Sequence, residues 1–404
     1  MDNDNRDNRD NRHDHRALGN RLDLFHQQED APGMVFWHPR GAILYRVLEN
    51  YIYQHMRRAG FHEVRTPQLL ARSLWERSGH LEKFGQNMFM VDDGERVLAL
   101  KPMSCPGHIQ IFNKRVRSYR DLPLRLCELG ACHRNELSGA LSGLMRTRAF
   151  EQDDAHIFCR VDQIDEEVHR FCALLKAVYL DFGFSDYVVK LSTRPLARAG
   201  SDAVWDRAEA ALESAAKASG LDYSVQPGEG AFYGPKLEFL LRDSRGREWQ
   251  CGTLQLDFVL PERLDAKYVD HESHRVRPVM IHHAILGSLE RFAAILLEHH
   301  RGDLPLWLAP EQVAVASVSD SQIEYARKVA AVFGRDGLRT VLDDRAETLS
   351  RRVVDAFESG IPVFAAVGAR DEQDGTVAIR RRSGKPVTMT IAEAARELRL
   401  EAKL

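Results

Sequence analysis

Long apolar runs are missing from this 404-residue sequence, in which no segment approaches the roughly 20 residues needed to span a bilayer. The opening residues are also too polar to contain the apolar core of a secretory signal peptide. The six cysteines include no Cys-x-x-Cys pair, and their scatter is typical of reduced thiols, not of a disulfide framework. These absences predict a cytoplasmic protein without a membrane partner.

A strong excess of charge is missing as well, because the formal net charge is only −3. Phosphate contacts depend on the local field, so a nearly neutral chain can still bind nucleic acid through a basic patch. The charge balance therefore neither indicates nor excludes a nucleic-acid partner. The composition, 44% hydrophobic and 28% charged, is that of a globular protein, and the length suffices for two domains with large cores.

The segment MDNDNRDNRDNRHDHR has almost no apolar residue to bury, so we expect a disordered polar tail over residues 1–20. An arm that touches RNA through its arginines is the alternative. Apolar residues then recur at helical spacing from Arg40 to Gly60, a residue that favours a helix end. The strand FHEVRTP should follow, ending at Pro67.

Strand-like runs dominate the next part of the chain, and few helices interrupt them. The strands are expected at 124–132, 146–159, 187–191, 234–241, 248–260 and 279–284, and the helices at 163–181, 203–218 and 288–300. This order favours an α+β fold over residues 21–303, in which helices pack on a mostly antiparallel sheet.

The proline-containing segment 304–310 resembles a linker. After it, strands and helices alternate strictly, which predicts a small α/β domain with βαβ crossovers over residues 311–404.

A hairpin over residues 124–159 carries charged side chains at strand spacing. Arg134 and Glu136 should face the same side of their strand, and Arg146 and Arg148 repeat that spacing on the return strand. An arginine fork suits a phosphate or a carboxylate, and a glutamate can accept from an amine or help to hold Mg²⁺. An exposed hairpin with surface salt bridges would show the same spacing, so the alternation leaves both interpretations open.

Arg291 stands in the first turn of an otherwise apolar helix. It could point toward an anionic ligand near the helix N-terminus, or it could be an interior arginine paired with Glu290 or with a carbonyl group.

Several strings resemble known synthetase motifs. FHEVRTP, CHRNE with its return strand and GSLERF resemble motifs 1, 2 and 3 of class II aminoacyl-tRNA synthetases. LKPMSCPGHIQIF, FEQDDAHIFC, KLSTRP, GEGAFYGPK, WQCGTLQLDF and PVMIHHAILGSLERF resemble the threonyl-tRNA synthetase family, in order, from about Leu22 to the C-terminus. The resemblance implies the class II antiparallel sheet, an anticodon-binding domain and a homodimer formed through motif 1. It also implies that threonine is activated with ATP and Mg²⁺ to threonyl-adenylate and transferred to the 3′ end of threonine tRNA.

The resemblance implies roles for the residues at matching positions. Arg134 would bridge the threonine carboxylate and the α-phosphate, and His80 would assist transfer unless it is only a loop histidine. The catalytic residues would be Arg134, Arg291, His80 and Lys236, and the ATP-binding residues Arg134, Glu136, Arg146, Gln255 and Arg291. Threonine would contact Gln152, Asp154, Tyr233 and Arg134, and the anticodon would contact Arg380 and Asp371.

A zinc ion is also implied, with Cys105, His156 and His282 as ligands. Their spacing along the chain would not reveal the site, but one thiolate and two imidazoles leave an open coordination position, as in catalytic zinc sites. Zinc could bind the amine and the β-hydroxyl of threonine and so reject valine, which an apolar pocket discriminates poorly. His283 should face the other side of its strand, and His133 is a rival ligand only if the resemblance misleads.

Departures from the family pattern define the open alternatives. Bacterial members usually begin with two further domains, one of which hydrolyses seryl-tRNA, so we expect no editing by this chain. Asp371 stands where a glutamate is common in the anticodon-binding domain. A paralogue that activates threonine or another β-hydroxy amino acid for specialised metabolism or inhibitor resistance is the alternative. A regulatory paralogue without activity is disfavoured, because the residues of the catalytic motifs are in place.

Overall fold

A computed structural model describes residues 13–403, and most of the predicted polar tail lies outside the described residues. The chain forms two compact units. The larger unit comprises Gln27–Val35 and Glu49–Ile295. The smaller unit comprises the segment up to His26, Phe36–Leu48 and the segment from Leu296. Among the described residues, no helix is both long and apolar enough to cross a membrane.

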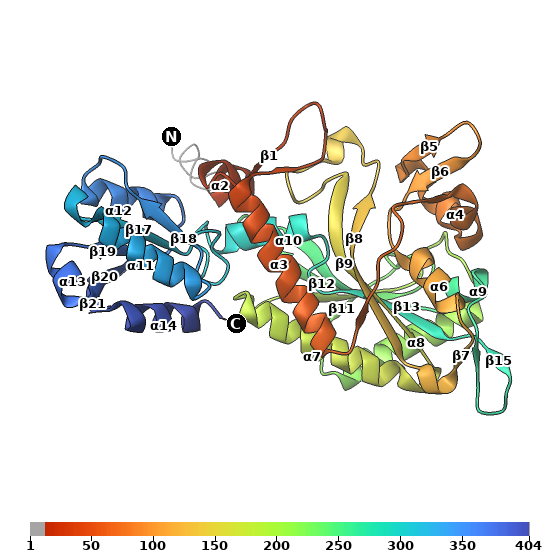
Figure 1. Cartoon of the computed structure of the whole chain (residues 1–404). Coiled ribbons are helices and arrows are strands. Elements are labelled where there is room, and N and C mark those ends of the chain that lie inside the picture. Colours follow the sequence, from red (N-terminus) through yellow and green to blue (C-terminus); the bar gives the residue numbers. More distant parts are fainter. Residues whose placement is uncertain (1–12, 404) are drawn as a thin grey trace, which may run out of the picture. The chain divides into compact units, whose positions relative to one another are not determined.

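An eight-stranded sheet is the centre of the larger unit (Figure 1). Its strand order is β11-β10-β12-β13-β16-β9-β8-β3, and all neighbours are antiparallel except at the two edges, where β10–β11 and β3–β8 are parallel. The strands are β3 (His62–Glu63), β8 (Leu124–His133), β9 (Ala149–Cys159), β10 (Val188–Ser192), β11 (Ser224–Gln226), β12 (Lys236–Arg242), β13 (Glu248–Asp257) and β16 (Val279–Ala284). The α+β prediction is therefore confirmed, although the strand expected to end at Pro67 is reduced to two residues.

Helices cover the faces of this sheet. α7 (Ile164–Asp181) packs beside α8 (Asp202–Ala218), and its Phe171 contacts Phe239 and His283 on one face. α6 (Cys105–Asn113) lies on the opposite face, because its His108 contacts His156. The sheet thus keeps one face for a packed core and leaves the other face, beneath α6, for polar side chains.

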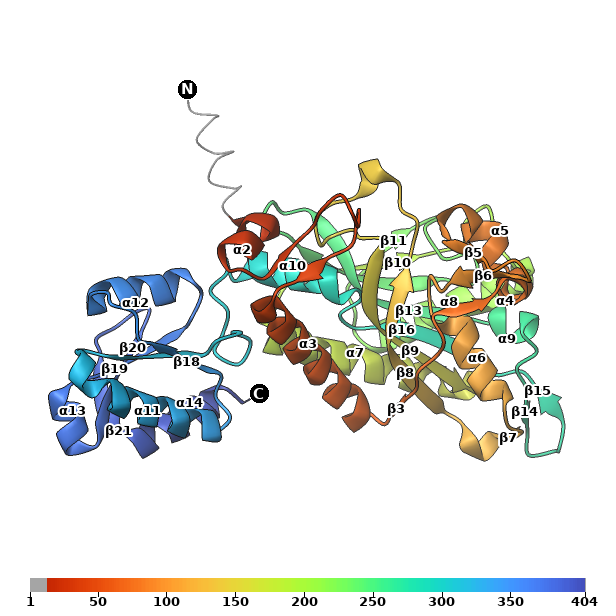
Figure 2. The same ribbon diagram turned by 45° about the horizontal axis from the view of Figure 1, so that its top comes forward.

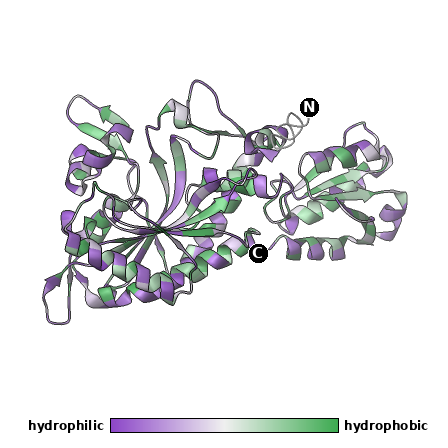
Figure 3. Cartoon of the chain, turned by 180° about the vertical axis from the view of Figure 1, so that it is seen from behind, coloured by the Kyte–Doolittle hydropathy of each residue, from purple (hydrophilic) through white to green (hydrophobic). Residues whose placement is uncertain are grey.

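Two helices confirm the sequence periodicity closely. α3 (Pro39–Arg58) buries Leu44, Leu48 and Ile52 at helical spacing, and the chain leaves it at Gly60 with φ +87°. α10 (Leu289–His299) lies within the predicted range 288–300. Figure 3 shows the apolar stripes of the helices and strands in green and their hydrophilic sides in purple.

Smaller elements complete the larger unit, and the sequence patterns did not predict them. One three-stranded sheet has the order β4-β6-β5, and another has the order β15-β14-β7 (Figure 2). These elements are β4 (Leu69–Ala71), α4 (Arg72–Ser78), α5 (His80–Phe84), β5 (Met90–Asp92), β6 (Val97–Leu100), β7 (Arg117–Ser118), α9 (Leu260–Arg263), β14 (Tyr268–Val269) and β15 (Arg275–Val276). They are too short for a clear periodic signal.

The smaller unit contains the predicted α/β arrangement. Its five-stranded sheet has the order β18-β17-β19-β20-β21, with β17 parallel to both β18 and β19 and the last two pairs antiparallel. Apolar side chains of β17, β19 and α11 form its core, among them Val315, Phe333 and Val363. The elements are β17 (Val313–Ser317), α11 (Ile323–Arg335), β18 (Thr340–Asp343), α12 (Leu349–Glu358), β19 (Val363–Val367), α13 (Ala369–Asp374), β20 (Thr376–Arg381), β21 (Val387–Thr390) and α14 (Ile391–Glu401).

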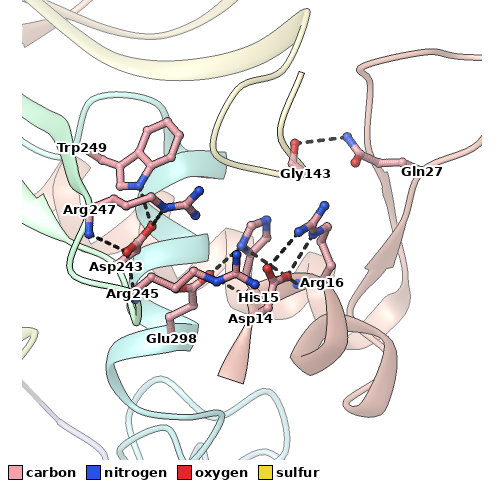
Figure 4. Close-up of polar contacts among 10 residues, drawn as sticks. All are labelled: Asp14, His15, Arg16, Gln27, Gly143, Asp243, Arg245, Arg247, Trp249 and Glu298. Atoms are coloured by element: carbon pink, nitrogen blue, oxygen red, sulfur yellow. Dashed lines mark hydrogen bonds and ion pairs between the residues drawn. The ribbon is translucent and has the colours of Figure 1, made fainter. Parts of the chain in front are cut away.

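The expectation of disorder is wrong for residues 13–20. α2 (His15–Arg21) begins there, and the Asp14 carboxylate caps it by accepting from the Arg16 backbone N–H at 2.9 Å. His15 is buried, and its Nδ1 lies 2.8 Å from Glu298 Oε1 (Figure 4). Composition alone predicts that these polar side chains face water, whereas the fold buries Asp14 and His15 and gives each a charged partner, Arg16 and Glu298. β1 (Phe25–His26) and β2 (Phe36–Trp37) follow as a short antiparallel pair.

The predicted linker 304–310 contains neither helix nor strand, but it is not an exposed tether. Leu304, Leu306 and Leu308 are buried. The guanidinium of Arg339 also donates to backbone carbonyls of this segment, including Trp307 O at 2.8 Å. The segment is therefore part of the smaller unit's packing.

Candidate functional site

One transverse row of the large sheet collects residues from four strands. Lys236 on β12 pairs with Gln255 on β13, Gln255 pairs with His282 on β16, and His282 pairs with His156 on β9. Directly paired residues of antiparallel strands point to the same face. Asp154 is two residues before His156 on β9 and shares that face. The register thus brings together residues that are far apart in sequence.

A buried group of three metal-binding side chains lies on this row. Cys105 Sγ and one ring nitrogen each of His156 and His282 lie within 4.8 Å of one another. Cys105 is the first residue of α6, and the two histidines are direct neighbours across β9 and β16, with His156 Nε2 3.0 Å from His282 Nδ1. All three side chains are buried. The structure therefore unites the predicted ligand set.

A hydrogen bond on the far side of the His282 ring fixes which of its nitrogens faces this group. His282 Nε2 donates to Asp257 Oδ2 at 2.9 Å, and the other oxygen of Asp257 accepts the backbone N–H groups of Val259 and Leu260. His282 Nδ1 therefore carries the free lone pair. A histidine that ligates a metal commonly donates its second N–H to a carboxylate in this way.

The charges around the group fit a divalent cation. Burial and the nearby carboxylates of Asp154 and Asp257 raise the pKa of the Cys105 thiol, so a thiolate requires a cation beside it. Burial lowers the pKa of His156 far below its ordinary value, which leaves a neutral imidazole with a lone pair to donate. One sulfur and two nitrogen donors match zinc with an open coordination position.

A cavity of about 590 Å³ opens over the row. Its wall contains the three candidate ligands, the predicted catalytic residue Lys236 and every residue predicted to bind ATP or threonine: Arg134, Glu136, Arg146, Gln152, Asp154, Tyr233, Gln255 and Arg291. The hairpin residues Arg134, Glu136 and Arg146 thus line one concave surface, although Arg146 is exposed and forms the ion pair with Glu136 that the surface-hairpin alternative also expects.

Two arginines of the cavity are held without a carboxylate. Arg291 donates to the carbonyls of Met145 and Gln250 at 2.8 Å each, and Arg134 donates to Pro102 O at 3.2 Å and lies over the Phe150 ring. Within residues 13–403, no carboxylate lies at ion-pair distance from either guanidinium. Burial lowers the pKa of Arg291, so its charge is poorly compensated and favours an anionic ligand.

The remaining charged groups near these arginines are paired. Arg146 Nη2 lies 2.9 Å from Glu136 Oε2, and Lys236 Nζ lies 2.8 Å from Glu238 Oε1. These pairs place two more cations at the cavity wall, and the carboxylates can be exchanged for phosphate oxygens when a ligand binds.

The turn before α10 is fixed by Asp153, a residue that the sequence analysis missed. Its carboxylate accepts the backbone N–H groups of Ile285, Leu286 and Gly287 at 2.7–2.9 Å, while burial raises its pKa to about 7. Gly287 has φ +75°, and a Cβ there would lie 2.6 Å from Cys251 O. This turn sets the direction in which α10 starts and hence the position of Arg291.

Trp249 is fixed in a similar way at the β12–β13 turn. Asp243 accepts the Trp249 indole N–H at 2.9 Å and the Arg247 side chain at 2.6 Å, as Figure 4 shows. The Arg291 guanidinium lies 5.7 Å from the centre of a Trp249 ring, a cation–π distance. The Asp243 turn thus positions Trp249, which in turn contacts the Arg291 guanidinium.

The amino-acid end of the cavity combines a ring, a hydroxyl and a carboxylate. The Tyr233 hydroxyl donates to Gln255 Oε1 at 2.7 Å, and its ring stacks on His282 at 4.9 Å between centroids. Asp154 Oδ2 accepts the Ser104 N–H at 3.1 Å, and its Oδ1 lies 3.6 Å from His156 Nε2. A small polar ligand here would meet donors and acceptors on opposite sides.

His80 lies directly behind Cys105. Its Nε2 is 3.6 Å from Cys105 Sγ, its Nδ1 is 2.7 Å from Ser78 Oγ, and its ring meets Phe232 edge to face. Burial lowers the pKa of His80 to about 3, so the imidazole is neutral at neutral pH. It is not a simple loop histidine, since its side chain is fully buried at the site.

The two predicted anticodon residues lie in the smaller unit and differ in exposure. Arg380 on β20 is exposed. The Asp371 carboxylate accepts the Gly368 N–H at one oxygen and the Thr376 hydroxyl at the other, both at 2.9 Å. Asp371 therefore already caps α13, whereas Arg380 is free to meet a polyanion from solvent.

Other site residues were missed because their partners are distant in sequence. They are Lys101, His108, Glu128, Asp153 and Asp257. The available signal was weak: Arg125 and Glu128 are the two charged residues of the strand run LRLCELGAC, and Cys105 and His108 have the i, i+3 spacing of one helix face.

The sequence matches the class II core domain of tRNA synthetases (G, H, P, S and T) over residues 87–300 and an anticodon-binding domain over residues 312–401. It is 56% identical to a threonine–tRNA ligase of Caulobacter vibrioides over 391 residues, which is 96% of this chain and 60% of that protein. A threonine–tRNA ligase of Rhodospirillum rubrum is 56% identical over 372 residues, 92% of this chain and 58% of that protein. The chain therefore spans about 60% of the length of the curated relatives it matches.

Solved structures agree with this similarity. A structure described as the RNA binding domain of threonyl-tRNA synthetase from Cryptosporidium parvum Iowa II matches with a TM-score of 0.93 and 41% identity, over 95% of this chain and 97% of that chain. A prolyl-tRNA synthetase from Cryptosporidium parvum matches with a TM-score of 0.73 at 16% identity, over 96% of this chain and 76% of that chain, which shows the shared fold alone.

Proposed function

The chain belongs to the threonyl-tRNA synthetase family of class II aminoacyl-tRNA synthetases, and from this premise we propose that it activates L-threonine with ATP and transfers it to the 3′ end of threonine tRNA. One observation carries the proposal. A single cavity joins a buried Cys/His/His group to two arginines that lack a carboxylate partner. The first feature suits a small chelating ligand, and the second suits a polyphosphate.

ATP would occupy the arginine side of the cavity, with Mg²⁺ bound to its phosphates. Arg134 would contact the α-phosphate, and Arg146 and Arg291 would hold the outer phosphates. The threonine carboxylate would then attack the α-phosphorus and release pyrophosphate, giving threonyl-adenylate without a covalent enzyme intermediate. Because the guanidinium groups of Arg134 and Arg291 are already held by backbone carbonyls, they favour the charge that develops at phosphorus without reorganising, whereas Arg146 would exchange Glu136 for a phosphate oxygen.

Threonine would occupy the side of the Cys/His/His group. Zinc held by Cys105, His156 and His282 would supply a Lewis acid for the amine and the β-hydroxyl. Asp154 would accept the hydroxyl proton in a hydrogen bond, and Gln152 and Tyr233 would orient the backbone atoms. Valine lacks the hydroxyl and would leave the zinc without that ligand and one oxygen of Asp154 without its hydrogen bond, which is a large penalty in a buried site.

The transfer step and the partners belong to the same proposal. His80 would assist transfer to the terminal ribose, and Arg380 and Asp371 would meet the anticodon. A homodimer would form through the β3 edge of the large sheet, where motif 1 ends, and the reaction would take place in the cytoplasm. Sedimentation analysis of the purified chain should show the dimer mass, and a monomer at micromolar concentration would contradict that part.

The function is tested by amino-acid-dependent ATP–pyrophosphate exchange. Threonine should support exchange, serine should support it about 10–200-fold less well because one methyl group is lost, and valine should remain at background. Exchange that is equal with valine, or absent with threonine, would contradict the proposal. Aminoacylation with and without threonine tRNA then separates a tRNA ligase from an enzyme that supplies adenylate to another acceptor.

A further inference from the structure

A chain of buried polar side chains runs away from His156 on the side opposite the cavity. His156 Nδ1 lies 2.7 Å from His108 Nδ1, and His108 Nε2 lies 3.2 Å from Glu128 Oε2. Glu128 Oε1 in turn accepts from Lys101 Nζ at 2.8 Å. All four side chains are at most 5% exposed, so water does not compete for these contacts.

The direction of each hydrogen bond follows from the carboxylate at the end. A carboxylate only accepts, so His108 Nε2 must carry a proton toward Glu128, and a ring with a single proton then has none on Nδ1. Its Nδ1 then offers a lone pair, and His156 Nδ1 must carry the proton that bridges the two rings. The lone pair of His156 is left on Nε2, the nitrogen that faces His282 and the cavity.

The negative charge of Glu128 is already balanced by Lys101. Its carboxylate can therefore accept a hydrogen bond from His108 without a positive charge on that ring. The Lys101 ammonium neutralises the carboxylate, and Thr66 donates both its backbone N–H and its hydroxyl at 2.8 Å. The contact with Glu128 therefore requires only one N–H group from the His108 ring. The opposite tautomer would place a proton on His156 Nε2 and block that nitrogen as a ligand.

The local architecture ties this link to the candidate metal ligands. Cys105 and His108 are three residues apart on α6, so one helix face presents both toward the sheet. Glu128 pairs directly with Asp154 across β8 and β9. A Cβ at Gly130 would lie 2.7 Å from Ser104 Oγ, so this glycine lets the start of α6 approach β8 closely.

We propose that Lys101, Glu128 and His108 form a positioning relay that holds His156 in the tautomer with a free Nε2 lone pair and thereby sets the affinity of the Cys105/His156/His282 group for zinc. The relay rests on the proposed function, because it concerns the same metal group. His108, Glu128 and Lys101 act through His156 and are positioning residues.

The sharpest test is E128Q, which keeps the shape but reverses one hydrogen bond. The amide oxygen would remain with Lys101 and the Thr66 N–H, so the NH₂ group would face His108 Nε2 and donate to it. His108 would then carry its proton on Nδ1, and His156 would be driven to the Nε2-protonated form. We expect zinc affinity to fall about 10–100-fold, the usual effect of losing an outer partner of a metal-bound histidine.

E167Q is the matched control. Glu167 is equally buried and pairs with Arg125, which lies on the same strand as Glu128, but it contacts the opposite face of the sheet. Both variants lose a buried ion pair, so both should lose thermal stability, and only E128Q should lose zinc affinity. Affinity is measured by competition with a chromophoric chelator at constant pH, without reference to catalysis.

A second pair of variants covers the case in which E128Q does not fold. H108N retains an acceptor at the Nδ1 position and should bind zinc nearly as the parent does, whereas H108L should lose affinity to the extent predicted for E128Q. Nitrogen-15 spectra of labelled histidine should show His156 protonated at Nδ1 in the zinc-free parent and at Nε2 in E128Q.

Failure of the relay can be distinguished from failure of the function. A parent protein that binds no zinc would overturn both. A parent that binds zinc and exchanges pyrophosphate, together with E128Q and H108L affinities within about twofold of the parental value, would overturn the relay alone.

Discussion

Replacing Arg291 with glutamine should slow threonine activation strongly while leaving the fold intact. Its guanidinium is fixed by two carbonyls at 2.8 Å and by Trp249, and it has no carboxylate partner within the described residues. Such a group gains its counter-charge only when a phosphate arrives. A pair of unit charges about 4 Å apart is worth about 4 kcal/mol at an effective dielectric constant near 20. Loss of one preorganised partner typically costs 10²–10³-fold in rate, about 3–4 kcal/mol.

The effect of R291Q on stability should be small and of either sign. Two hydrogen bonds to carbonyls are lost, at about 1 kcal/mol each. Burial lowers the pKa of Arg291, which means that the charged guanidinium is costly to bury. Removing it offsets the lost hydrogen bonds, because the free energy of desolvating the guanidinium no longer opposes folding. We therefore expect the urea midpoint to change little while the exchange rate falls about 10²–10³-fold.

R339Q provides the matched control for this variant. Arg339 is also an arginine that donates only to backbone carbonyls, and burial lowers its pKa, but it belongs to the smaller unit. Its replacement should leave threonine-dependent exchange per folded molecule unchanged. The reasoning would be refuted if R291Q kept more than about a tenth of the parental rate, or if its activity fell only in proportion to the fraction unfolded.

Three further outcomes are expected. C105S should lose the bound zinc found by elemental analysis, about one per chain, and with it threonine-dependent exchange, while C172S, at another buried cysteine, should retain both. Burial acts to raise the pKa of Glu128, but the bonds from His108, Lys101 and the Thr66 N–H together outweigh it and lower the pKa from 4.5 to about 2. The stabilising contribution of Glu128 is therefore complete above pH 4.5 and is lost as the pH falls toward 2. The unfolding free energy of the parent relative to E128Q should therefore drop by about 3 kcal/mol over that interval in acid titrations followed by circular dichroism. R380A should reduce aminoacylation of threonine tRNA and leave pyrophosphate exchange unchanged, and an equal loss in both assays would remove Arg380 from the anticodon surface.

The secondary structure that the sequence predicted best is the part with a strong period and a large buried face. In α3 the residues Leu44, Leu48 and Ile52 repeat at helical spacing, and β16 is an uninterrupted buried strand with the bounds expected for it. Both signals are local, because the period of 3.6 or the apolar run is imposed by the one face that each element buries.

Short elements were not predictable for the same reason. β4, β5 and β6 have three or four residues each, too few for a period to emerge. The helix α2 was missed because, besides the buried Leu18, it depends on the Asp14 cap and on the distant Glu298, and neither contact shows as an apolar period. Composition describes the average environment of a residue and cannot supply a partner 283 positions away.

The resemblance of the motifs to a known family named the ligands and the phosphate-binding arginines, but their convergence depends on strand register. His156 and His282 are 126 residues apart and meet only because β9 pairs with β16 in one register, and a shift by one residue would turn each ring to the other face. By itself the sequence determined which side chains were available and which segments could form strands and helices. The tertiary structure alone decided that Lys101, His108, Glu128 and Asp257 stand behind the two imidazoles, because a hydrogen bond requires a separation near 3 Å that no spacing along the chain encodes.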